Sequence, residues 1–328
     1  MSTTPWPNFR CPVHEIGLLH EASCLSCPRS HDFLIINGIP RFVAQSNYAD
    51  HFGLQWNHFR RTQLDSYTKV PTSRDRLRRC IGETLWKELP GKLVLECGCG
   101  AGRFTEVLLE RGCSVMSIDL SNAVDANAQN CEPSEFHRLA QADIGQLPFE
   151  LQQFDLVLCL GVVQHTPDPE LTMRALYGQV KPGGWLVIDH YTDRLGWYTK
   201  VASLFRVLMK RMPPDRALAM SERLVDLFLP LHKSVRRVPI IRSVVYRLSP
   251  VISYYTALPE LDDRLQYEWA RLDTHDSLTD WFRAFRTRTQ ITQAFDALGM
   301  DAIWCEYGGN GVEARGQRPL RSGHEDAG

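Results

Sequence analysis

The segment that most restricts what this chain can fold into is a glycine-rich loop between a short apolar run and a helical pattern. The run Leu93–Leu95 is followed by Glu96 and then by a glycine at every second position from 98 to 102. Apolar residues recur at helical spacing from Phe104 to about Arg111. Glycine lets the backbone approach a ligand without a Cβ atom in the way, and the following helix offers free N–H groups and a positive dipole. The segment therefore predicts a strand, a ligand-binding loop and a helix.

The spacing of the glycines separates two kinds of nucleotide-binding loop. A dinucleotide-binding loop reads G-x-G-x-x-G, and its third glycine would fall on Arg103 of this sequence. The loop here reads E-x-G-x-G-x-G instead. The next predicted strand, residues 114–118, ends at Asp119, about 20 residues beyond the loop, where folds of this kind hydrogen-bond a ribose diol. The glycine spacing therefore fits a dinucleotide poorly, and Asp119 is a candidate partner for a ribose.

The pattern E-x-G-x-G-x-G resembles motif I of the class I methyltransferases that use S-adenosylmethionine. Three later segments (141–149, 154–169 and 181–190) resemble further motifs of that family in the same order. The resemblance implies methyltransferase activity with S-adenosylmethionine as cofactor. It also implies an α/β fold with a Rossmann-like, seven-stranded, mostly parallel sheet that closes with an antiparallel hairpin (302–307 and 312–317).

The resemblance also implies which residues bind the cofactor. The positions that match are Glu96, Gly98, Cys99, Gly100, Gly102, Asp119, Leu120, Asp143, Ile144, Leu160 and Gly161. Residues 51–65 and 269–276 resemble stretches of a recurring bacterial group of these enzymes. In the first stretch, Gln55, Trp56, Arg61 and Gln63 are candidates for an N-terminal lid over the cofactor. The same stretch also fits an amphipathic helix that packs on the sheet, and both interpretations can hold together.

Methyl transfer from a sulfonium depends mainly on alignment, and a general base helps when the acceptor is a hydroxyl or a protonated amine. His165 is the first candidate base, because it follows the fourth strand at the carboxyl edge of the sheet, where ligands bind. A histidine that only packs or caps the next loop is the alternative. His190 and Tyr191, after the fifth strand, are weaker candidates.

The N-terminus contains two closely spaced pairs of metal-ligand residues. Cys11 and His14 form one pair, Cys24 and Cys27 form the other, and His31 is a competing donor. Four such ligands suit a tetrahedral zinc ion with no open position, which would be structural; four unliganded side chains are the alternative. The stretch also resembles the short zinc-ribbon module that precedes some bacterial methyltransferases.

Residues 194–250 leave the strand–helix pattern and concentrate basic charge. The whole chain has a net charge of −1, but this segment holds twelve Lys or Arg and three acidic residues, a net +9. Apolar residues at helical spacing predict a helical insert, where this family usually places additions that recognise substrate. Three interpretations stay open: a solvated cap, a surface for an anionic membrane or lipid-linked substrate, and a site for a phosphate-bearing acceptor such as a nucleotide sugar or RNA.

These segments give the expected organisation of the chain. It comprises a zinc-ribbon-like module (1–45), a helical lid (46–90), a cofactor-binding core (91–193), the basic insert as substrate cap (194–274), the last helices and strands of the core (275–318) and a tail (319–328).

The expected function is methyl transfer to a small-molecule, sugar-linked or lipid-linked acceptor. An RNA methyltransferase that uses the ribbon and the insert, and a non-catalytic cofactor-binding scaffold, are the alternatives. The Asn/Asp-Pro-Pro-Tyr/Phe motif of many nucleic-acid methyltransferases is absent after the fourth strand, which favours small molecules. The sequence opens without a secretory leader pattern, lacks long apolar runs, and has ten cysteines without a disulfide framework. We therefore expect a cytoplasmic protein, with contact at the inner membrane face as an option.

Overall fold

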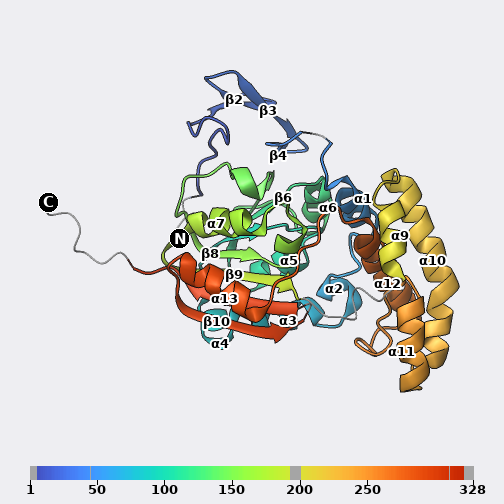
Figure 1. Ribbon diagram of the computed structural model, residues 1–328. Coiled ribbons are helices and arrows are strands. Elements are labelled where there is room, and N and C mark those ends of the chain that lie inside the picture. Colours follow the sequence, from blue (N-terminus) through green and yellow to red (C-terminus); the bar gives the residue numbers. More distant parts are fainter. Residues whose placement is uncertain (1–5, 45, 193–200, 310, 321–328) are drawn as a thin grey trace.

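The computed structural model describes residues 6–44, 46–192, 201–309 and 311–320, and its central element is a seven-stranded sheet (Figure 1). The strand order is β10-β11-β9-β8-β5-β6-β7. Strands β5 to β9 run parallel, whereas β11 is antiparallel to both β9 and β10. The strands are β5 (Leu93–Cys97), β6 (Ser114–Asp119), β7 (His137–Gln141), β8 (Phe154–Cys159), β9 (Val180–Tyr191), β10 (Asp301–Gly308) and β11 (Gly311–Gln317). The predicted Rossmann-like sheet with a closing antiparallel hairpin is confirmed.

Helices cover both faces of this sheet, which explains why its strands read as continuous apolar runs. In β5, Val94 packs with Leu77 of α3 and Phe104 of α5, whereas Leu95 belongs to the opposite core with Leu176 of α7. The helices are α1 (Asp50–His58), α2 (Asp65–Thr68), α3 (Thr72–Ile81), α4 (Glu83–Glu88), α5 (Arg103–Glu110), α6 (Ala123–Asn130), α7 (Pro169–Gln179), α9 (Ala202–Met209), α10 (Pro214–Val235), α11 (Pro239–Leu248), α12 (Asp263–Thr279) and α13 (Arg288–Ala297). Two 3₁₀ turns, η1 (Ile144–Gln146) and η2 (Val163–His165), follow β7 and β8.

The N-terminal residues form a separate four-stranded antiparallel sheet, seen at the top of Figure 1. Its strands are β1 (Leu19–His20), β2 (Cys24–Cys27), β3 (His31–Ile36) and β4 (Ile39–Pro40). Directly after β4, Arg41 joins this sheet to the core: it forms a bridge with Gln141 at the end of β7 and an ion pair with Asp125 at 2.6 Å. The module is thereby held against the edge of the main sheet.

Helices α9, α10 and α11 form the predicted insert and lie at the right-hand edge of the molecule in Figure 1. Helices α9 and α10 pack on α12 through an apolar core that includes Met209, Leu229 and Leu278, and α11 packs on α10. The expected boundary between insert and core at 274 falls inside α12, which runs unbroken after its N-cap Asp262 accepts a hydrogen bond from Leu265. Residues 194–200 of the predicted insert, Asn310 of the predicted hairpin turn and residues 321–328 of the tail lie outside the described residues.

None of the helices within the described residues combines the length and apolar character needed to cross a lipid bilayer.

Candidate active site

A cavity of 1230 Å³ opens at the carboxyl ends of the parallel strands. Its wall takes residues from the end of each strand in turn: Gly98 and Gly100 after β5, Asp119 at the end of β6, Asp143 after β7 and Leu160 after β8. Ligands of open α/β sheets bind at this edge. The remaining predicted cofactor residues on the cavity wall are Cys99, Leu120, Ile144, Gly161, Gln55 and Trp56.

The glycine loop bends so closely around its neighbours that side chains are excluded. Gly98 has a φ of +72°, and a Cβ atom there would lie 2.2 Å from the side chain of Val162. At Gly100, with a φ of +50°, a Cβ atom would lie 3.1 Å from the indole of Trp56. Both glycines line the cavity. A narrow backbone cradle beneath an aromatic lid therefore forms one side of the site.

Two residues predicted to bind the cofactor, Gly102 and Glu96, lie behind the loop and not on the cavity wall. Gly102, with a φ of +94°, is the N-cap of α5 and lies beside Asn127. Glu96 is buried and accepts hydrogen bonds from the hydroxyls of Thr105 and Ser117. Burial raises the pKa of Glu96 to about 7, and these hydrogen bonds lower it in part. Neither residue lines the cavity, and both support the loop; that they contact the cofactor stays a prediction.

The two acidic residues after β6 and β7 suit the polar part of a nucleoside. One carboxylate oxygen of Asp119 accepts a hydrogen bond from the Gly100 backbone N–H at 3.0 Å, and the other accepts from the N–H and hydroxyl of Ser121. Asp143 accepts from the Gly145 N–H at 2.8 Å. Both carboxylates also line the cavity. The cradle, the two acids and the aromatic lid together fit S-adenosylmethionine.

Of the four predicted lid residues, Gln55, Trp56 and Gln63 line the cavity, whereas Arg61 does not. It is exposed, and its guanidinium stacks over the ring of Tyr67 at 4.5 Å. On the cavity wall, the side-chain oxygen of Gln63 accepts a hydrogen bond from Arg103. Burial lowers the pKa of Arg103 to about 10. In the sequence, Arg103 served only as the position where a dinucleotide-binding loop would have its third glycine; the structure places it on the cavity wall.

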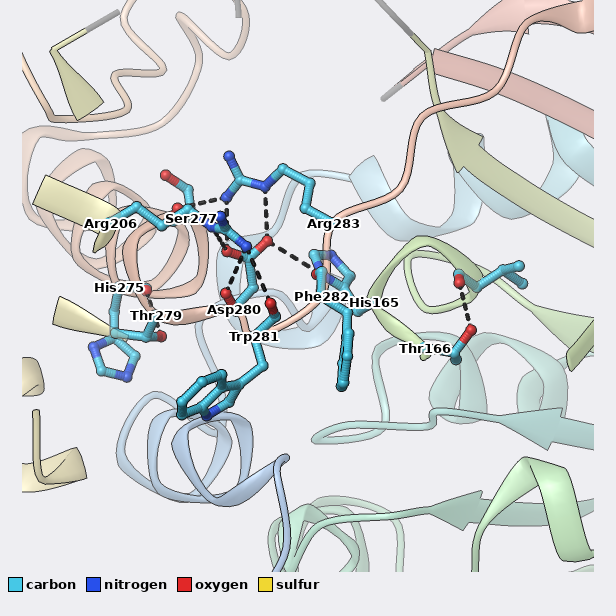
Figure 2. Close-up of polar contacts among 11 residues, drawn as sticks. His165, Thr166, Arg206, His275, Ser277, Thr279, Asp280, Trp281, Phe282 and Arg283 are labelled. Carbon is cyan, nitrogen blue, oxygen red and sulfur yellow. Dashed lines mark hydrogen bonds and ion pairs between the residues drawn. The ribbon is translucent and has the colours of Figure 1, made fainter. Parts of the chain in front are cut away.

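His165 lies on the cavity wall with one ring nitrogen engaged (Figure 2). Its Nδ1 is 3.2 Å from the carbonyl oxygen of Phe282 and 3.4 Å from a carboxylate oxygen of Asp280. The ring is 8% exposed and packs edge-on against Phe52 and Tyr191. Among the described residues, no hydrogen bond engages the other nitrogen, Nε2. The imidazole is therefore held in one orientation with one nitrogen left for a ligand.

Asp280 is the centre of a buried charged cluster. Figure 2 shows His165, Arg206 and Arg283 converging on its carboxylate, with the Nε atom of Arg283 at 2.7 Å. Burial would raise the pKa of Asp280, but the hydrogen bond with His165 and the two arginines lower it to about 2. Burial disfavours protonation of His165, yet the bond with Asp280 and the charge of Asp276 leave its pKa raised. The cluster thus keeps Asp280 ionised beside an imidazole of increased basicity.

The two weaker candidates separate because neighbouring residues of a strand point to opposite faces. Tyr191 lies on the cavity wall beside His165. His190 is buried on the other side of β9, where its Nδ1 lies 2.9 Å from the Tyr191 carbonyl oxygen. Burial lowers the pKa of His190. The prediction that His190 points into the crevice is therefore wrong.

Sequence reasoning missed Asp276, Asp280 and Arg283, which lie more than 100 positions beyond His165. Burial raises the pKa of Asp276, which also lines the cavity, to about 7. The one available signal was the stretch 269–276, but nothing in its spacing paired it with the loop after β8. The packing of α12 against α1, and the backbone hydrogen bonds of the segment after α12 to Gln164 and Tyr191, bring these residues to the site.

The N-terminal module contains a compact group of metal-ligand side chains. Ligand atoms of Cys11, His14, Cys27 and His31 all lie within 4.8 Å of one another. His14 Nδ1 is 3.2 Å from the Cys27 sulfur and 3.7 Å from the Cys11 sulfur. Ligands of a tetrahedral zinc ion lie about 3.3–3.8 Å apart, given bonds of about 2.0–2.3 Å. The Nδ1 atom of His31 is buried and has no hydrogen-bond partner in the described part of the chain, which suits a metal ligand.

Cys24, predicted as the fourth ligand, lies outside this group. Cys24 and Cys27 are three positions apart on β2, and side chains at odd separations on a strand point to opposite faces. The Cys24 sulfur contacts Glu21 and Ser26 instead. His31 is the direct cross-strand neighbour of Cys27, which places it on the correct face. The strand geometry therefore brings the competing donor His31, and not Cys24, into this group.

Comparison with known proteins agrees with this site. Residues 95–188 match the family model described as "Methyltransferase domain". A segment of 102 residues is 40% identical to the "Ubiquinone biosynthesis O-methyltransferase" of Pseudomonas fluorescens (strain SBW25) and to that of Pseudomonas entomophila (strain L48). The match covers 29% of this chain and 43% of each relative, so it spans less than half of these curated proteins.

Solved structures of similar description align over more of the chain. A putative S-adenosyl-L-methionine-dependent methyltransferase from Methanococcus maripaludis covers 86% of this chain and 98% of its own, with 12% identity and a TM-score of 0.45. A methyltransferase from Mesorhizobium loti covers 74% and 96%, with 17% identity and a TM-score of 0.43. These scores are low, and the strand order and the family match carry the assignment. Residues 95–188 therefore belong to a class I S-adenosylmethionine-dependent methyltransferase domain.

Proposed function

We propose that this protein transfers a methyl group from S-adenosylmethionine to a hydroxyl of a small-molecule, sugar-linked or lipid-linked acceptor. The observation that carries the proposal is the His165–Asp280 pair on the wall of the cavity that also contains the glycine loop. A buried carboxylate that orients a histidine, whose second nitrogen faces a ligand site, is the arrangement of a general base. A hydroxyl acceptor needs such a base, because it must lose its proton as the new bond forms.

S-adenosylmethionine supplies an electrophilic methyl carbon, and the sulfonium sulfur keeps the electrons of the bond that breaks. Asp119 and Asp143 would hold its ribose and adenine, and the backbone of Gly98–Gly100 would lie against it. The Nε2 atom of His165 would accept the proton of the acceptor hydroxyl as its oxygen attacks. The imidazolium that results is stabilised by Asp280, whose own proton affinity stays low beside Arg206 and Arg283. The indole of Trp56, which lies against the glycine loop, would help to exclude water from the site.

Two further observations support oxygen as the acceptor atom. The curated relatives cited above are named O-methyltransferases. The loop after β8 reads Leu160-Gly-Val-Val-Gln-His165 and lacks the Asn/Asp-Pro-Pro-Tyr/Phe motif of many amino-group methyltransferases that act on nucleic acids.

The test uses labelled S-adenosylmethionine and fractionated cell extract, with label sorted into small-molecule, glycan, lipid and RNA pools. With the labelled acceptor in hand, His165→Gln should lower kcat by about 10²–10⁴-fold, as expected for loss of a general base. Asp280→Asn should lower kcat less and move the acid limb of the kcat–pH profile to lower pH, because Asp280 raises the pKa of His165. His190→Gln is the matched control.

Label in RNA would replace the proposed acceptor class, and no label in any pool would favour a cofactor-binding scaffold. An unchanged acid limb in Asp280→Asn would contradict the role of His165 as base.

We also propose that the N-terminal module holds a structural zinc ion through Cys11, His14, Cys27 and His31. The mutual proximity of their ligand atoms supports this set. With four protein ligands the ion would lack an open position, and it would fix the turn at residues 11–14 against the β2–β3 hairpin.

A further inference from the structure

The exposed large apolar side chains of this chain are unevenly distributed. Eleven of the 21 within the described residues lie between Leu204 and Leu248, on α9, α10, α11 and the turn before α11. Single exposed apolar residues are ordinary, but a concentration on one layer of helices marks an interaction surface. These helices form the outer layer of the insert, away from the sheet (Figure 1).

Helix α11 presents the most pronounced apolar face. Ile240, Ile241, Val244 and Leu248 are 80%, 51%, 50% and 62% exposed. Their spacing of one, four and eight positions places them along one side of the helix. The helix has no buried residue at all. Its apolar side chains therefore contribute little to the core of the insert.

Basic residues flank this apolar face. Arg237 lies just before α11 and Arg247 near its end beside the stripe, and the ion pairs among the described residues give neither a carboxylate partner. Arg242 points to the other side of the helix, where it donates to the Arg236 carbonyl. Residues 201–250 contain ten Lys or Arg and only three Asp or Glu. An apolar stripe beside unpaired arginines is the pattern of a helix that lies in the interface of an anionic bilayer.

We propose that the outer face of the insert, centred on α11 and continued by α9, docks on an anionic lipid surface. A second copy of the chain meeting this face symmetrically would bring two basic surfaces together, which opposes association. RNA would require rings for base stacking, whereas the exposed large apolar residues from 204 to 248 are all Leu, Ile, Val or Met. Anionic lipid matches both the charge and the apolar side chains.

The docking face adjoins the candidate active site. The Val201 N–H donates to the Arg247 carbonyl at 3.1 Å, so the start of α9 meets the end of α11. At this seam Ala202, Ser249 and Pro250 also line the large cavity. Docking through α11 therefore holds one wall of the cavity near the bilayer surface.

The test is co-sedimentation of the full chain with vesicles of phosphatidylcholine alone or with 30% phosphatidylglycerol (about 30 mol per 100 mol lipid). We expect binding only to the anionic vesicles, weakening as salt rises. Ile240→Ser/Ile241→Ser should weaken binding about tenfold or more, and Arg237→Gln/Arg247→Gln about fivefold per arginine. Leu34→Ser/Leu151→Ser and Arg29→Gln/Arg174→Gln, on exposed residues outside the insert, are the matched controls.

Equal binding to both kinds of vesicle, or equal losses in the control variants, would overturn the proposal. So would a wild-type dimer in sedimentation velocity that Ile240→Ser/Ile241→Ser dissociates, because the face would then join two copies. The circular dichroism spectrum of each variant verifies folding. Because the readout is vesicle binding, the result is independent of methyl transfer.

Discussion

Asp119 has two tasks that a single substitution can separate. Its carboxylate ties the glycine loop to the end of β6 through the Gly100 N–H, and it faces the cavity where a ribose would lie. Asp119→Ala removes a charged hydrogen-bond acceptor and should weaken S-adenosylmethionine binding by roughly 1–3 kcal/mol, measured by isothermal titration calorimetry. Asp119→Asn should lose less, because an amide oxygen can still accept from the loop.

Asp296→Ala, at an exposed position on α13, is the control. Unchanged affinity in Asp119→Ala would remove the ribose assignment.

Glu96 predicts a pH-dependent effect on stability. Its pKa is raised to about 7 in the folded chain, from 4.5, mainly by burial. The folded state therefore holds this proton more tightly than the unfolded state, and the stability that the proton confers is lost as pH rises from about 4.5 through 7. Glu96→Gln keeps the group neutral at every pH.

The free energy of unfolding of Glu96→Gln minus that of wild type should rise by on the order of 2–3 kcal/mol from pH 5 to pH 8. Urea unfolding at both pH values measures it, with exposed Glu88→Gln as control. A difference between the two chains that does not change with pH would show that Glu96 is ionised throughout.

At the scale of elements, the β2–β3 hairpin determines which side chains can share a metal. Register pairs Cys27 with His31, and the strand alternation turns Cys24 away. We expect about one zinc ion per chain, measured by elemental analysis of protein purified without added chelator. His31→Ala should lose the metal, whereas Cys24→Ser should retain it.

Zinc loss in Cys24→Ser with retention in His31→Ala would restore the original ligand set. Metal-free, folded wild-type protein would remove the site altogether. Thermal unfolding with and without a chelator tests the structural role, because a bound metal stabilises the folded chain.

Elements with local signals could be predicted from the sequence, and contacts between distant segments could not. The run Leu93–Leu95 and the glycines after it predicted β5 and α5, because apolar continuity and glycine spacing are local properties. Cys24 lies outside the group of ligand side chains because the two cysteines of a CxxC pair share one side in a tight turn but point to opposite faces within a strand. The prediction that His190 points into the crevice is wrong for the same reason, because neighbouring residues of β9 point to opposite faces of the sheet.

At the scale of the whole molecule, the strand order followed from the motif order, but the polar cluster at the site did not. Asp280 and Arg283 reach His165 through the packing of α12 beside α1 and through the backbone hydrogen bond from Ala284 to Gln164, and no spacing in the sequence encodes these contacts. Likewise, the composition located the basic insert, yet only the burial of each residue distinguished the exposed face of α11 from the core of the insert.

Helix α12 has a consequence for the modularity of this chain. Ala270 and Leu278 belong to the core of the insert, while Leu272 packs with Phe59 near the lid, and Asp276 lines the active-site cavity. Helix α12 thus packs against the insert with some of its side chains and lines the active-site cavity with others. Deleting residues 201–262 to leave a minimal transferase would expose the apolar side of α12 that now packs on the insert, next to the active-site cavity. We therefore expect that the insert can be transplanted between proteins only together with α12 and the part of the active site that α12 lines.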